Sequence, residues 1–121
     1  MKVIYIHDAI YEASISVIPK CTAAELVKYF KKHGVTYEEG NEVEALHYKL
    51  VDPFKGQTYH YLIFEEFSNT PYGIAVFMHE VYHLIHSILQ ERGLVHSDDS
   101  EEAFTYYLQY LTEKILGRLI K

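Results

Sequence analysis

Alternating apolar and polar residues predict four β-strands in the first half of the chain. Residues 2–7 and 11–18 are rich in β-branched and aromatic side chains, and a short link joins them. This composition favours two paired strands. Every other position of the second segment is apolar, which is typical of a strand with one buried face. A second pair of strands is predicted at residues 45–51 and 57–66, because the link between them contains the Pro and Gly of a turn.

Apolar residues at helical spacing predict three helices. The first begins at a capping box in which Thr22 and Glu25 cap each other. The second and most apolar helix begins at Thr70 and Pro71, a cap residue followed by a first-turn proline, and ends at Gly93. A core-facing stripe marks the third helix, with apolar side chains at Phe104, Leu108, Leu111, Ile115 and Leu119.

The order of these segments indicates an α+β fold in a single domain, residues 1–121. We expect a small antiparallel or mixed sheet of about four strands with three helices. Residues 97–102 are dense in cap residues and acids, which favour the start of a helix, so the last two helices should form an antiparallel pair. Residues 35–44 are acidic and contain Gly-Asn, which predicts a loop or a frayed strand.

Composition excludes several classes of function. The formal charge of −6 is spread along the chain, which argues against nucleic-acid or anionic-membrane binding, since both need clustered Lys and Arg. Cys21 is the only cysteine, so neither an intramolecular disulfide nor a thiolate zinc site can form. The apolar stretch at the start is too short for a signal peptide, and the most apolar segment carries three His and a Glu, unlike a membrane span. We therefore expect a cytoplasmic protein.

The main chemical signal is the sequence His79-Glu80-Val81-Tyr82-His83 in the second predicted helix. Residues four apart project from one helix face, and Glu80 lies about 100° round the axis, beside a metal held by the two histidines. In zinc hydrolases two imidazoles hold Zn²⁺, the metal lowers the pKa of a water, and the carboxylate accepts its proton. The alternative is that these histidines line a polar crevice or hydrogen-bond to neighbouring strands.

A catalytic zinc site needs a third protein ligand. His86 lies on the same helix face as His79 and His83, but about 10 Å along the axis from His79. We therefore expect it to face substrate or to support a ligand. The alternative is that it is a hydrogen-bonded histidine at the edge of the crevice. Glu101 and Glu102 open the following helix, which returns toward the two histidines. Either could reach the metal, or both could merely complement the helix N-terminus.

The spacing from His83 to Glu102-Ala103 resembles that of the gluzincin metallopeptidases, and the segment at residues 71–116 resembles small phage or prophage proteins of this minimal type. The resemblance implies a zincin-like domain in which His79, His83 and Glu102 bind Zn²⁺ and Glu80 is the general base. It also implies that the strand from Tyr59 to Glu65 is an edge strand that pairs with an extended peptide substrate.

Gluzincins also carry a separate side chain that stabilises the oxyanion, and no fixed spacing identifies it in this chain. Tyr106, Tyr110 and His60 are candidates, each with a structural role as its alternative. The leading hypothesis is therefore a zinc-dependent peptidase, with Tyr106 and His86 as further catalytic candidates. The alternative is a non-enzymatic phage-type accessory or binding protein that keeps a metal-binding helix. A di-iron carboxylate site, suggested by Glu-x-x-His at 44–47 and 80–83, is set aside because it needs a four-helix bundle.

Overall fold

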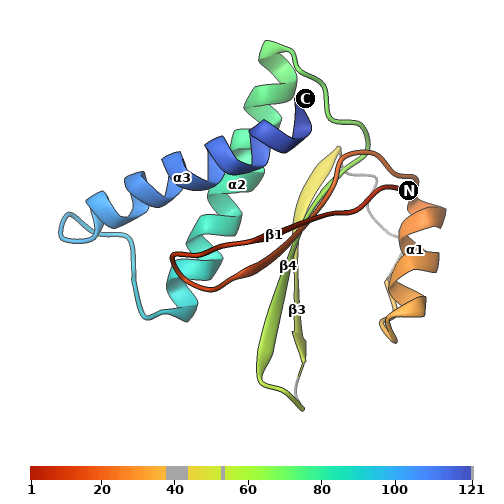
Figure 1. Ribbon diagram of the computed structural model, residues 1–121, viewed down its shortest axis with the longest axis horizontal. Helices are drawn as coiled ribbons and strands as arrows, with labels where there is room; N and C mark the ends of the chain where they lie inside the picture. The colour runs from red at the N-terminus through yellow and green to blue at the C-terminus, as the bar shows by residue number, and fades with distance from the viewer. Residues whose placement is uncertain (38–43, 53, 121) are drawn as a thin grey trace.

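The computed structural model describes residues 1–37, 44–52 and 54–120 (Figure 1). Four strands, β1 (Ile4–His7), β2 (Ser14–Ile18), β3 (Ala45–Asp52) and β4 (Gln57–Phe64), form one sheet in the order β1-β2-β4-β3. The pairs β1/β2 and β3/β4 are antiparallel, as hairpin-like neighbours in sequence require, while β2 and β4 run parallel. The predicted α+β fold with a mixed sheet of four strands and three helices is thus confirmed.

Helix α1 (Ala23–Lys32) covers one face of the sheet, and the other two helices cover the opposite face (Figure 1). The predicted capping box is present: the Thr22 side chain accepts from the Glu25 N–H, and the Glu25 carboxylate accepts from the Thr22 N–H. Leu26 and Phe30 on its inner side pack against the strand residues that face α1. These contacts bury an aromatic cluster on this side of the sheet.

Helix α2 (Pro71–Glu91) lies against β3 and β4 on the other face. Thr70 caps it by accepting from the Gly73 N–H, and Pro71 occupies the first turn, both as predicted. At the C-terminal end Gly93 has φ 80°, and the Leu94 N–H donates to the Leu89 carbonyl at 2.9 Å. This closing bond is typical of a Schellman motif, whose left-handed residue favours glycine. One side of α2 enters the main core, with Phe77, Val81, Leu84, Ile85, Ile88 and Leu89 buried.

Helix α3 (Glu101–Leu119) returns across α2 in the opposite direction (Figure 1). The predicted stripe faces the core, with Phe104, Leu111 and Ile115 buried. The stripe also includes Tyr107, which the apolar pattern does not single out. Its hydroxyl donates to the buried carboxylate of Asp8, which fixes the middle of α3 to the turn between β1 and β2.

One prediction about the strands is wrong, and another lies partly outside the described residues. The segment from Tyr59 to Glu65 was expected to be an edge strand, and this is wrong: β4 pairs with β2 on one side and with β3 on the other. The outer strand beside α2 is β3, because the sheet order places it next to β4 alone. Residues 38–43 of the predicted loop or frayed strand lie outside the described residues. Within the part of the chain that the structure describes, no helix has the length and apolar character needed to cross a membrane.

Candidate metal centre

His79 and His83 lie one turn apart on the exposed side of α2, with their Nε2 atoms 3.3 Å apart. Their ring centroids are 4.9 Å apart. Two nitrogens bound to one tetrahedral zinc, each at about 2.0–2.1 Å, must lie about 3.3–3.4 Å from one another. The two imidazoles therefore have the separation that a shared divalent cation requires, and histidine nitrogen is a favoured zinc donor.

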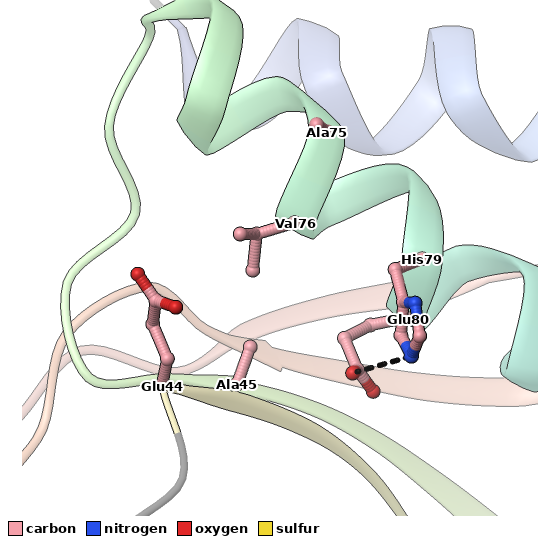
Figure 2. Close-up of a pocket in the computed structure, with 6 residues that line it drawn as sticks. All are labelled: Glu44, Ala45, Ala75, Val76, His79 and Glu80. Carbon is pink, nitrogen blue, oxygen red and sulfur yellow. Dashed lines mark ion pairs between the residues drawn. The ribbon is translucent and has the colours of Figure 1, made fainter.

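Glu80 turns from this pair toward the sheet. It is 8% exposed, and its Oε1 atom lies 3.8 Å from the Nε2 atom of His79 (Figure 2). Burial raises the pKa of the Glu80 carboxyl, while the nearby His79 and His83 and the main-chain N–H of His47 on β3 oppose this rise. A carboxylate that lies beside two imidazoles, and is more basic than usual, has the properties of a general base.

A cavity of about 450 Å³ opens beside this carboxylate, between α2 and the start of β3. Figure 2 shows its lining, which consists of Glu44, Ala45, Ala75, Val76, His79 and Glu80. The small alanine side chains leave the space open. Glu44 lies across the cavity from His79 in Figure 2, and its Oε2 atom accepts from the Tyr72 hydroxyl at 2.6 Å. The cavity can thus admit a small group of a ligand next to Glu80.

The structure does not bring the predicted third ligand, Glu102, to the histidine pair. Two contacts set the register between the helices: the rings of His86 and Phe104 are 6.5 Å apart, and Thr112 Oγ1 lies 3.8 Å from Met78 Sδ. With this register Glu102 lies about 7 Å further along α2 than His83. Glu101 and Glu102 are both exposed, and among the described residues no three His, Cys, Asp or Glu side chains are grouped to hold a metal ion.

The other predicted catalytic residues lie apart from this pair. Tyr106 is 68% exposed on the outer side of α3, and the Tyr110 hydroxyl contacts the turn between β1 and β2. His86 is exposed beside Phe104. His60 is buried within the sheet. In the part of the chain that the structure describes, none of these four makes a polar contact with His79, Glu80 or His83, so the oxyanion donor stays unassigned.

A chain of polar side chains under α2 was missed from the sequence. His47 on β3 and His60 on β4 meet at 2.9 Å between Nε2 and Nδ1, with their ring planes 15° apart. The Nε2 atom of His60 lies 3.1 Å from a carboxylate oxygen of Glu91, although the two atoms do not form a hydrogen bond. Lys49 Nζ lies 3.4 Å from the same oxygen.

Both imidazoles of this chain are kept neutral. Burial, followed in importance by neighbouring positive groups, lowers the pKa of His47 and that of His60 to about 4. One of the groups that lower the pKa of His47 is His83 of the histidine pair on α2. The sequence did contain a signal for it, because pairing 45–51 with 57–66 through a short turn puts residues 47 and 60 on the same face.

Comparison with protein-family models, curated proteins and solved structures found no match. The resemblance to gluzincins therefore stays a prediction carried by this chain's own residues. The structure brings together His79, Glu80 and His83 as helical spacing predicted, and adds a cavity and a buried histidine chain beside them. Function must be inferred from the chemistry of these groups.

Proposed function

We propose that the protein is a zinc-dependent hydrolase of the minimal gluzincin type and that it cleaves peptides in the cytoplasm. The observation that carries this proposal is the 3.3 Å separation of the His79 and His83 Nε2 atoms, with the buried Glu80 carboxylate beside them. A hydrogen bond between the two rings gives a similar spacing, and two nitrogens that share one tetrahedral zinc need the same separation. The adjacent cavity supplies room for a substrate group.

Each residue of the motif has a distinct role in the proposed reaction. His79 and His83 would hold the metal, and a bound Zn²⁺ would supply Lewis acidity and make water acidic near neutral pH. Glu80 accepts the proton of the attacking water and later returns it to the leaving amine. Its carboxylate is buried and lines the cavity, so it faces the cavity rather than solvent. Glu102 remains the third ligand that the resemblance to gluzincins implies.

The outer edge of β3 is the best candidate for binding an extended peptide, in place of β4. Within the described residues β3 pairs with no strand other than β4. The His47 N–H approaches Glu80. This edge of β3 therefore passes beside the proposed general base. A peptide that adds a strand to this edge would form main-chain hydrogen bonds and bring a scissile bond to the carboxylate.

A cleavage assay with Glu80→Gln tests this proposal. Purified wild-type protein with zinc is incubated with a mixed peptide library, and products are identified by mass spectrometry. We expect Glu80→Gln to keep its bound zinc and to lose cleavage by about 100-fold or more, because proton transfer contributes at least that much. Glu113→Gln, an exposed carboxylate on α3, is the matched control and should cleave normally.

Two outcomes would overturn the proposal in different ways. If wild-type protein with a full equivalent of zinc cleaves no peptide, the enzyme proposal fails and a metal-containing binding protein becomes the better interpretation. If Glu80→Gln cleaves as fast as wild type, Glu80 is not the general base.

A further inference from the structure

We propose that the cavity beside Glu80 receives a Lys or Arg side chain of the peptide substrate, and that Glu44 binds the positive charge of this side chain. This inference deepens the proposed function and rests on it, because it assumes that Glu80 is the general base. It defines the substrate as a peptide with a basic residue next to the bond that is cleaved. The cavity volume of about 450 Å³ lies within the range of ligand pockets, about 300–1,000 Å³.

The carboxylate of Glu44 is held in place across the cavity from the histidine motif (Figure 2). The main-chain carbonyl of Glu44 accepts from the Glu65 N–H at 2.9 Å, which extends the pairing of β3 with β4 by one residue. The Oε2 atom of Glu44 accepts from the Tyr72 hydroxyl at 2.6 Å. Its Oε1 atom and the Tyr72 oxygen can still accept hydrogen bonds. Together they suit an ammonium or guanidinium group, which donates several.

The charge of Glu44 is not matched by a basic group of the described residues. Within residues 1–37, 44–52 and 54–120, no Lys, Arg or His forms an ion pair with it. Residues 38–43 contain three further glutamates and no basic residue in their sequence. Glu80 adds a second carboxylate to the described lining, which includes no Lys or Arg. An acidic side chain of a peptide would therefore be repelled, whereas a basic one would be attracted.

The walls between Glu44 and Glu80 are apolar. Figure 2 shows Ala45 on β3 and Val76 on α2 between the two carboxylates. Ala75 completes the apolar part of the lining. Lys and Arg combine an apolar stem with a charged end, so one side chain can cover these walls and also reach an acid. A purely apolar side chain would cover the same walls but would remove water from the Glu44 carboxylate without pairing it.

The length of a basic side chain matches the distance to be covered. Glu44 comes three residues before His47, whose main-chain N–H approaches Glu80, and three residues of extended chain span about 10 Å. A lysine side chain extends about 6 Å over its five bonds, and a hydrogen bond at its end adds about 3 Å. A Lys residue whose carbonyl group lies beside Glu80 can therefore reach Glu44. A residue with a short side chain cannot.

Cleavage of matched peptides tests the inference. A peptide that wild-type protein cleaves in the presence of zinc is remade with Lys, Arg, Leu or Glu at each position beside the scissile bond, and kcat/KM is measured for each peptide. We expect the Lys and Arg peptides to be cleaved about 10-fold better than the Leu peptide, because a hydrogen bond to a charged group contributes about that much. The Glu peptide should be the poorest substrate.

Two substitutions at one position separate charge from shape. Glu44→Gln keeps the size of the side chain and removes its charge, so the preference for Lys over Leu should disappear. Glu44→Lys should reverse the preference and favour the Glu peptide. Glu65→Gln is the matched control, because Glu65 pairs with Glu44 through the main chain but acts on Cys21, in the cluster that packs against α1. Its loss should leave the preference unchanged.

Binding of the same peptides to wild-type protein in a chelator, measured by fluorescence anisotropy, gives a second readout that needs no turnover. The Lys peptide should bind more tightly than the Leu peptide, and Glu44→Gln should remove the difference. Equal cleavage and binding of the two peptides, or a preference that survives in Glu44→Gln, overturns the role of Glu44 and leaves the proposed hydrolase standing. If wild-type protein with zinc cleaves no peptide, the proposed function itself fails, and this inference fails with it.

Discussion

Replacing His60 with Gln should remove much of the loss of stability that this protein suffers in mild acid. His60 is 1% exposed, and burial lowers its pKa from 6.5 to about 4 in the folded protein. In the unfolded chain the ring binds a proton as pH falls through 6.5, whereas the folded protein resists protonation until about pH 4. The stability that the neutral ring contributes is therefore present above pH 6.5 and is lost progressively as pH falls toward 4.

The expected size of this effect follows from the two pKa values. Between pH 7 and pH 5 the difference in proton binding at His60 lowers the free energy of unfolding by about 2 kcal/mol. Urea unfolding at both pH values, with a chelator present to keep metal away, measures this loss. His60→Gln cannot titrate, so we expect its loss to be smaller by about 2 kcal/mol, even though the variant is less stable at both pH values. His86→Gln, on the exposed side of α2, should behave like wild type.

The comparison of pH dependences separates the titration of His60 from simple loss of packing. A variant that is merely destabilised has a lower free energy of unfolding by the same amount at pH 7 and at pH 5. If wild type and His60→Gln lose equal stability between pH 7 and pH 5, His60 is not buried in its neutral form, and the chain from His47 to Glu91 does not exist as described.

Two further predictions concern single groups that hold the fold together. Tyr107→Phe removes a hydroxyl that donates to the buried Asp8 carboxylate, so the free energy of unfolding should fall by about 1.5–3 kcal/mol in urea titrations. Tyr106→Phe, on the exposed side of the same helix, should change it by less than about 0.5 kcal/mol, and equal effects would contradict the packing of α3. Gly93→Ala should lower the melting temperature, because a φ of 80° disfavours any side chain. Gly117→Ala should raise it, because this glycine lies inside α3 with open space at the Cβ position. If both variants change the melting temperature in the same direction, the assigned end of α2 is wrong.

Much of the fold could be predicted because its signals are local. The capping box at Thr22 and Glu25, the start of α2 at Thr70, and the glycine that ends α2 each depend on a few adjacent residues. The order of strands could not be predicted in the same way. The parallel pairing of β2 with β4 joins segments about 40 residues apart, and no local pattern states which strand lies at the edge. This is why the segment from Tyr59 to Glu65 was wrongly expected to be exposed to a peptide.

In the candidate site, too, local features could be predicted and long-range packing could not. His79, Glu80 and His83 come together because helical spacing alone sets their relative positions. The position of Glu102 depends on how α3 slides along α2, which the turn at residues 92–100 and the packing of Phe104 decide. Tyrosine adds a second difficulty, since its apolar ring and polar hydroxyl suit either environment. Neither the burial of Tyr107 nor the exposure of its neighbour could therefore be read from the residue type.

Elemental analysis of the purified protein tests the central claim most directly. After expression without added metal and extensive dialysis, wild-type protein should contain close to one equivalent of zinc per chain. His83→Ala removes one of the two nitrogens that lie 3.3 Å apart and should contain almost none. A full equivalent of zinc in His83→Ala, or none in wild type even after zinc is added back, would contradict the assignment of this histidine pair as a metal centre.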